Sequence, residues 1–574
     1  MAGFDLVIRG GTVADGTGGP VRTADVAVRD GVVVEVGRVA GRGEREVDAT
    51  GALVTPGFVD IHAHYDGQAT WDRSLAPSSW HGVTTVVMGN CGVGFAPVRP
   101  SDHGRLIELM EGVEDIPGSA LHEGLSWEWE SFGEYLDAVD RMPHDIDVAA
   151  QVPHGALRLH VMGERGAQRE PATPEEIARM AALAREAVEA GALGFTTSRT
   201  INHRTSRGEP TPTLTAAADE LVGIARGLGE AGRGVLQVVS DHLNRDDEFA
   251  MFRRMVAESG RPLSFSLVQS PAQPGAYREV LDRITAARRD GLAITGQVAT
   301  RAVGLLFGLQ CTLHPFMANP VFAEIAGLPP AEQARIMADP GFKARVLEAN
   351  STEGVRDKIG GMVISRFKYM FELGDPPDYE PALSDSIAAR AERAGRAADD
   401  LVYDLLVADE GRTLLYMPTL NFGGGSLDAV GDMLAHDHTV PGLGDGGAHV
   451  GTICDGSFPT TLLTMWGRDR ERGRLPLEFL VRRHCRDTAR TVGLEDRGVL
   501  APGYRADVNV IDFERLAARR PEVRYDLPAG GRRLLQRADG YLHTFVRGVE
   551  TYAGGEATGD APGCLVRGPR PAPG

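Results

Sequence analysis

The sequence predicts a mixed α/β protein, a (β/α)8 barrel of the TIM type with a small β-sandwich domain formed by both chain ends. Two observations lead to this prediction. The middle of the chain alternates apolar runs with amphipathic helical stretches, which is the pattern of a parallel sheet covered by helices. Both ends are instead rich in strand-forming residues and are broken by glycine.

The two ends share one β texture. Short strands are expected at residues 5–9, 25–29, 32–36, 506–512 and 541–552. Asp30-Gly31 separates two of them as the turn of a hairpin. We therefore expect residues 1–57 and 490–565 to form one composite domain.

Helix-then-strand units mark the barrel. Thr173–Glu176 (TPEE) is a capping box with Pro at the first helical position, and Gly191 ends the helix before the strand-like GFTTS. Similar steps follow at residues 214–240, 249–269 and 277–298. Repetition of this unit favours a barrel over residues 58–489, with insertions near 100–150 and 315–410.

Composition excludes several classes of partner. Lys and Arg number 60 against 79 Asp and Glu, and the resulting net charge of −19 disfavours nucleic acid and anionic membranes. We find no signal peptide and no apolar stretch long enough to span a bilayer. The five cysteines form no CxxC pair, which indicates a reducing cytoplasm. Association into a homo-oligomer is left open.

The strongest chemical signal is Val54–His64 (VTPGFVDIHAH). Residues two apart on a strand face the same side, so His62 and His64 would both point into the barrel, where two imidazoles can share a metal ion. The alternative is that these are two unrelated histidines on a strand that share no metal ion. The preceding PGFVD favours the metal site, because it places the pair on the first barrel strand.

Four motifs resemble the amidohydrolase superfamily and, within it, the D-aminoacylase branch. In chain order they are PGFVDIHAH at 56–64, GVTTVVMGNCG at 82–92, LGDGGAH at 443–449 and GVLAPGYRAD at 498–507. Together with the terminal β segments, the resemblance extends over nearly the whole chain.

The resemblance implies a role for each motif residue. His62 and His64 would bind metal, Cys91 would be a thiolate ligand, and Asp445 would contact the metal and act as general base. The implied cofactor is Zn²⁺, one or two ions, with another divalent metal as the alternative. From residue type alone, Cys91 would be a small buried side chain and Asp445 a turn former.

The sequence departs from that branch on the fifth and sixth strands, each of which ends there in a ligand histidine. Here the fifth strand reads GVLQVVSDH, so His242 lies two or three positions after the place of the family's ligand histidine. The sixth strand reads PLSFSLVQ and contains no histidine. The nearest candidates to complete the site are His242, with a capping or loop role as the alternative, and His449. Because His449 lies four residues after Asp445, it is also a candidate catalytic residue. The metal site is expected to be mononuclear, weaker or differently completed.

Three arginines are candidates for substrate binding: Arg158, Arg199 and Arg301 each lie at or just after a strand-like run. A guanidinium there can contact a substrate carboxylate with two hydrogen bonds. A surface arginine is the alternative for each.

These observations predict a metal-dependent deacylase that hydrolyses the amide bond of a small-molecule N-acyl amino acid, D-configured or not, or of a related N-acylated amine. One alternative is a cyclic amide, imide or lactone hydrolase of the same superfamily. Another, motivated by the missing histidines, is a catalytically degraded binding or scaffold protein.

Overall fold

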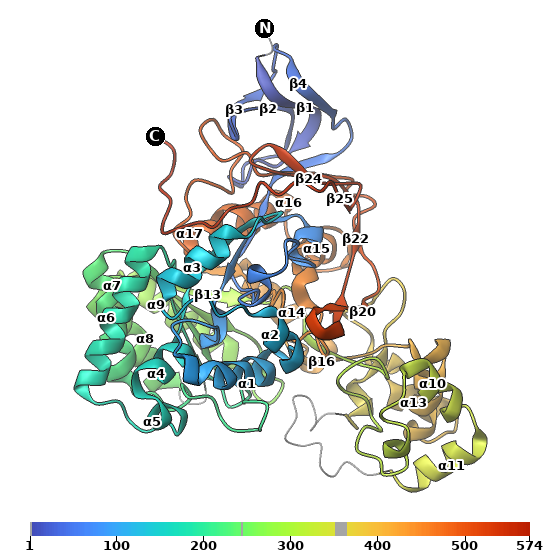
Figure 1. Ribbon diagram of the computed structural model, residues 1–574. Coiled ribbons are helices and arrows are strands. Elements are labelled where there is room, and N and C mark those ends of the chain that lie inside the picture. The colour runs from blue at the N-terminus through green and yellow to red at the C-terminus, as the bar shows by residue number, and fades with distance from the viewer. Residues whose placement is uncertain (1–2, 243–244, 351–363) are drawn as a thin grey trace.

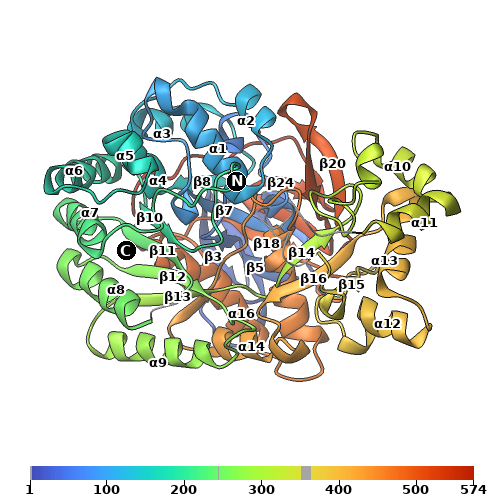
Figure 2. The ribbon, with the colours of Figure 1, turned by 90° about the horizontal axis from the view of Figure 1, so that it is seen from below.

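The computed structural model describes residues 3–242, 245–350 and 364–574. The β domain lies at one end of the molecule, above the barrel in Figure 1. A lobe with helices α10 (Pro330–Met337), α11 (Pro340–Glu348) and α13 (Ala398–Val407) lies to one side of the barrel (Figures 1 and 2).

Parallel strands form the barrel. Among the described residues they are β6 (Phe58–Asp60), β7 (Val83–Met88), β8 and β9 (Asp147–Ala150 and Val152–Pro153, one bent strand), β10 (Gly194–Arg199), β11 (Val235–Ser240), β12 (Leu263–Leu267), β13 (Ile294–Val298) and β17 (Thr439–Pro441). The seam closes between the segments after β17 and β6, where Asp445 N–H donates to His62 O at 3.0 Å and His64 N–H donates to Gly446 O at 2.7 Å. The predicted barrel is confirmed.

Helices α6 (Pro174–Ala190), α7 (Ala218–Ala231), α8 (Arg245–Ser259) and α9 (Ala276–Arg289) cover the outside of the barrel, as Figure 2 shows. The predicted capping box begins α6. Thr173 Oγ1 accepts from the Glu176 amide at 3.2 Å, and Glu176 Oε2 accepts from the Thr173 amide at 2.8 Å. This reciprocal pair fixes where the helix starts.

Both chain ends contribute to one nine-stranded sheet. Its strands are β1 (Phe4–Val13), β2 (Arg22–Arg29), β3 (Val32–Gly37), β4 (Gly43–Asp48), β5 (Leu53–Pro56), β18 (Val508–Ile511), β23 (Tyr541–Val546), β24 (Val549–Ala553) and β25 (Glu556–Ala557). The antiparallel pair β5–β18 joins the two ends. Because β5 leads directly into β6, this sheet fixes where the HxH segment enters the barrel.

Two insertions lie near the mouth of the barrel. Helices α1 (His103–Glu114), α2 (Gly118–Gly124) and α3 (Phe132–Arg141) separate β7 from β8. The second insertion, between β13 and β17, contains α10, α11, α12 (Ile387–Arg393) and α13, with the strands β14 (Val303–Phe307), β15 (Phe371–Glu372) and β16 (Leu415–Leu420). It packs around its own apolar cluster, which includes Phe316 and Leu406.

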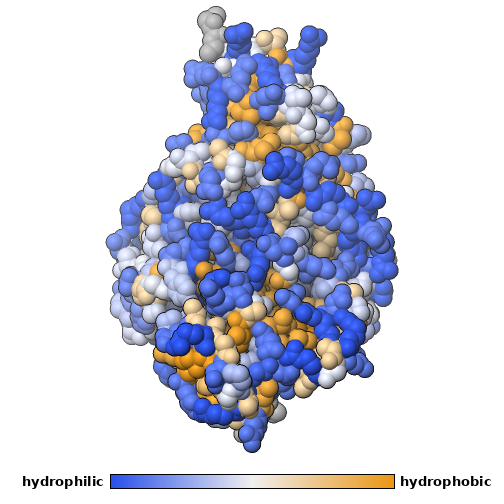
Figure 3. Space-filling model, turned by 90° about the vertical axis from the view of Figure 1, so that its right-hand side faces the viewer, coloured by the Kyte–Doolittle hydropathy of each residue, from blue (hydrophilic) through white to orange (hydrophobic). Residues whose placement is uncertain are grey.

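A hairpin near the C-terminus reaches back to the barrel mouth. Strands β20 (Glu522–Leu527) and β21 (Gly531–Leu535) form it, and the Leu534 amide donates to Val450 O at 2.6 Å. The face in Figure 3 is mostly hydrophilic. In the described ranges no helix is long and apolar enough to cross a bilayer.

Candidate metal centre

Four side chains from different strand ends converge at the mouth of the barrel. His62 and His64 follow β6, Cys91 follows β7, and Asp445 follows β17. His62 Nε2 lies 3.3 Å from Cys91 Sγ and 3.4 Å from Asp445 Oδ1. His64 Nε2 lies 3.6 Å from the same Asp445 oxygen. The structure therefore brings together the four residues that the motifs single out.

The spacing of these donor atoms fits a divalent cation. Ligands at zinc distances of about 2.0 to 2.3 Å in a tetrahedron lie roughly 3.3 to 3.7 Å from one another. One ligand atom from each of His62, His64 and Cys91 can be chosen so that all three lie within 4.8 Å of one another. Both ring nitrogens of His64 and Oδ1 of Asp445 are buried without a hydrogen-bond partner. Buried polar atoms rarely lack a partner, so these unpaired donors indicate an ion site.

Backbone conformation also singles out this site. Cys91, Asp445 and His449 have φ angles of 55°, 47° and 49°, in the left-handed region. For a residue other than glycine this conformation costs on the order of 1–2 kcal/mol, and such strain concentrates at functional sites. The turn at Cys91 is held by Thr196 on β10, whose Oγ1 accepts from the Gly92 amide at 3.1 Å.

Electrostatics favours the ligand forms of the histidines. Burial lowers the pKa of His62 and of His64 despite the opposing charge of Asp445, so both imidazoles are neutral. Burial alone would raise the pKa of Asp445, but the adjacent imidazoles of His64, His62 and His449 favour its ionised form and hold the pKa well below its usual range. Burial raises the pKa of the Cys91 thiol, so the thiolate requires a neighbouring cation.

Glu114, the last residue of α1, is a site residue that sequence reasoning missed. Its Oε1 lies 3.3 Å from His64 Nδ1 and its Oε2 lies 3.6 Å from His449 Nε2. Glu114 is fully buried, and neither carboxylate oxygen has a hydrogen-bond partner. It lies in an insertion outside every motif. The available signal in the sequence was a carboxyl group on the apolar face of an amphipathic helix.

His203, in the loop after β10, is a second residue outside the motifs. Its Nδ1 lies 2.9 Å from Ser198 Oγ. Burial and the nearby His449 and His64 lower its pKa to about 3. His203 is therefore a neutral imidazole.

The fifth and sixth strands of the barrel are β11 and β12, and neither presents a histidine to the centre. His62 Nδ1 donates to Gln297 Oε1 at 2.9 Å, and Gln297 Nε2 donates to Ser264 Oγ on β12 at 2.9 Å. Gln237 on β11 pairs in register with Ser264, so both face the barrel interior. The amide group of Gln237 is buried without a partner. Polar uncharged groups thus occupy these inward positions.

The structure contradicts the prediction that His242 completes the metal site. Its Nε2 donates to Ser266 O at 3.2 Å, and its ring packs 5.1 Å from that of Phe265. Phe249 and Phe252 of α8 surround the same ring. A left-handed backbone at His242, with φ of 50°, directs the side chain toward α8 and away from the barrel interior.

The three predicted substrate arginines are engaged within the protein. The carboxylates that pair with Arg158, Arg199 and Arg301 are Glu220, Glu248 and Asp455, at 2.8, 2.8 and 3.1 Å. Arg158 and Arg301 are also fully buried, and Arg199 donates to Ala216 O at 2.6 Å. These contacts within the protein occupy the three guanidinium groups, and their role in substrate binding stays a prediction.

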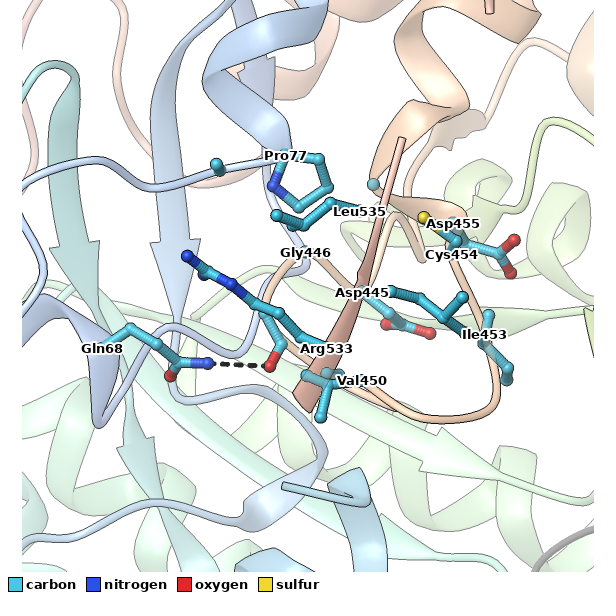
Figure 4. Close-up of a pocket in the computed structure, with 15 residues that line it drawn as sticks. Gln68, Pro77, Asp445, Gly446, Val450, Ile453, Cys454, Asp455, Arg533 and Leu535 are labelled. Atoms are coloured by element: carbon cyan, nitrogen blue, oxygen red, sulfur yellow. Dashed lines mark hydrogen bonds between the residues drawn. The ribbon is translucent and has the colours of Figure 1, made fainter. Parts of the chain in front are cut away.

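A narrow crevice runs beside Asp445 (Figure 4). Its walls come from the segment after β17, from Gln68 and from Arg533 on the C-terminal hairpin. Gln68 Nε2 donates to Gly447 O at 3.0 Å across one wall. The crevice has about 20 Å³ of free space, enough for about one water molecule.

Comparison with known proteins decides the family. A family model described as "Amidohydrolase family" matches residues 45–556. The chain belongs to the amidohydrolase family. The superfamily resemblance predicted from the four motifs is confirmed, and with it the prediction of a metal-dependent hydrolase.

Among curated relatives, the D-aminoacylase of Alcaligenes xylosoxydans xylosoxydans is 28% identical over 579 residues, 98% of this chain and 97% of that protein. The N-acyl-D-aspartate deacylase of the same organism is 28% identical and covers 88% of this chain and 86% of its own length. A crystal structure of D-aminoacylase superposes with a TM-score of 0.65 at 25% identity, covering 99% of this chain and 100% of that one. These relatives support the D-aminoacylase branch.

Proposed function

We propose that this amidohydrolase is a deacylase that hydrolyses the amide bond of an N-acyl amino acid, with one zinc ion held by His62, His64, Cys91 and Asp445. The convergence of these four donors is the observation that carries the proposal. Imidazole and thiolate ligands suit zinc better than magnesium or calcium. Relatives named as deacylases of N-acyl-D-aspartate and N-acyl-D-glutamate support this substrate class.

The side chains of this site fit amide hydrolysis. A bound zinc ion would polarise the amide carbonyl and make water more acidic. Asp445, which remains ionised, accepts the proton of the attacking water and returns it to the leaving amine. The crevice beside Asp445 has room for that water. His449 has a buried Nδ1 without a partner, which makes it the second proton acceptor at the site.

A single ion is proposed because a second ion would need imidazole ligands from β11 and β12. The inward side chains on these strands are instead Gln237 and Ser264. The structure of one D-aminoacylase is 26% identical to this chain and covers 99% of it with a TM-score of 0.66. One-metal activation and second-metal attenuation are described for that enzyme. One ion is therefore compatible with catalysis on this fold. The intact donor set argues against a degraded scaffold.

We place the enzyme in the cytoplasm, since all five cysteines are free thiols. Its proposed partner is the small-molecule substrate alone.

A substrate panel tests the proposal. Purified protein loaded with Zn²⁺ is assayed on N-acetyl-D- and N-acetyl-L-amino acids, and in parallel on hydantoins and lactones. Release of free amino acid, abolished by a chelator and restored by Zn²⁺, is the expected result. Turnover of only the cyclic substrates would replace the proposal with the cyclic amide or lactone hydrolase. No metal binding and no turnover would favour the scaffold.

A further inference from the structure

The Nδ1 atoms of His62 and His64 face away from the donor cluster, and each lies near a side-chain oxygen. His62 directs Nε2 toward Cys91 and Asp445, and its Nδ1 contacts Gln297 Oε1 at 2.9 Å. His64 directs Nε2 toward Asp445, and its Nδ1 lies 3.3 Å from Glu114 Oε1. A histidine that binds metal commonly donates its other N–H to a carboxylate or amide oxygen, which fixes the ring and its tautomer.

Glu114 also connects to the segment that carries the catalytic base. Its Oε2 lies 3.6 Å from His449 Nε2, and its backbone oxygen accepts a hydrogen bond from the His449 amide. The next residue, Asp115, accepts from the Gly451 amide at 3.2 Å and from Thr312 Oγ1 at 3.1 Å. The end of α1 therefore contacts the segment after β17 at several points.

From this geometry we propose that Glu114 is a positioning residue of the metal centre. With the ion bound, its Oε1, 3.3 Å from His64 Nδ1, would accept the Nδ1–H of His64 and leave Nε2 of His64 for the ion. Its Oε2 lies 3.6 Å from His449 Nε2, and its backbone oxygen accepts from the His449 amide, so the same residue holds that ring beside Asp445. A carboxylate from an inserted helix thereby supports the ligand set that strands five and six leave incomplete. This inference rests on the proposed function, because it presumes that the ion binds.

Metal affinity, measured apart from activity, tests the role. Zinc dissociation constants are obtained by chelator competition for the wild type, Glu114→Gln and Glu114→Met. The control is Glu108→Gln on the same helix, where Glu108 forms an ion pair with Arg207. We expect affinity to fall at least about 10-fold in both Glu114 variants and to remain unchanged in the control. The melting temperature of the metal-free protein should not fall, since without the ion Glu114 is a buried carboxyl group whose oxygens have no hydrogen-bond partner and whose pKa burial raises.

Cobalt spectra separate positioning from ligation. The d–d bands of the Co²⁺-loaded wild type should persist in Glu114→Gln at saturating Co²⁺, because the ligands themselves are unchanged. Wild-type affinity in both variants would overturn the inference. So would a fall in affinity matched by a large fall in metal-free stability, or a change in the Co²⁺ spectrum that shows direct ligation by Glu114. If the wild type itself binds no metal, the proposed function fails first.

Discussion

His62 Nε2 lies 3.4 Å from Asp445 Oδ1, although almost the whole barrel separates the two residues in sequence. Barrel closure produces this contact, because the backbone of Asp445 also donates to His62 O. The segments that follow the first and last strands of the barrel thus bring a ligand and a base to one point.

Replacement of Asp445 by Asn should remove turnover without removing the ion. An amide cannot accept the water's proton, whereas His62, His64 and Cys91 remain as ligands. We expect kcat to fall by at least about 100-fold. Steady-state kinetics and elemental analysis of the same sample check this. Substantial residual activity in Asp445→Asn would show that another group is the base.

Replacement of Cys91 by Ala should weaken metal binding and remove the thiolate-to-metal charge-transfer absorption of the Co²⁺ form, because Sγ lies 3.3 Å from His62 Nε2. The matched control is Cys311→Ala, a buried thiol in a different apolar cluster. An unchanged charge-transfer band in Cys91→Ala would exclude this thiol as a ligand.

His242→Ala should reduce stability and leave metal content unchanged. The ring packs among Phe249, Phe252 and Phe265, so its removal opens a cavity worth about 1–3 kcal/mol of unfolding free energy. Urea unfolding measures the loss, and His64→Ala, which should lose the metal, is the comparison. Loss of metal in His242→Ala would return this histidine to the ligand set.

His484 should make the protein sensitive to acid. It is buried with both ring nitrogens unpaired, and burial lowers its pKa to about 3. Between pH 6.5 and 3 the unfolded state binds a proton that the folded state does not, so acidification favours unfolding by up to about 1.4 kcal/mol per pH unit. His484→Phe should lose less stability than the wild type between pH 7.5 and 5.5. Urea unfolding with chelator present measures this, with exposed His122→Phe as control. Equal losses in wild type and His484→Phe would contradict the assignment.

Local sequence signals were sufficient for much of the fold. The capping box at Thr173 marks the start of α6, and the Asp30-Gly31 turn lies between β2 and β3. The two-residue spacing of His62 and His64 predicted that both side chains point to one side, and they do meet at the barrel mouth, although both residues lie just after β6. In each case the determining interaction is between residues close in the chain.

Long-range packing decides what the sequence could not show. Glu114 enters the site only because α1 packs against the segment that carries His449. His242 leaves the site because one left-handed residue turns it toward the phenylalanines of α8. The three arginines look like free cations in sequence, and only the fold supplies the carboxylates Glu220, Glu248 and Asp455 that pair with them.

X-ray absorption spectroscopy of the zinc-loaded enzyme, combined with its metal content, shows which side chains hold the ion. One zinc ion per chain is predicted, with one sulfur ligand at about 2.3 Å and nitrogen and oxygen ligands at about 2.0 to 2.1 Å. A zinc ion without a sulfur ligand, or a protein that binds no divalent ion, would show that His62, His64, Cys91 and Asp445 do not form a zinc site.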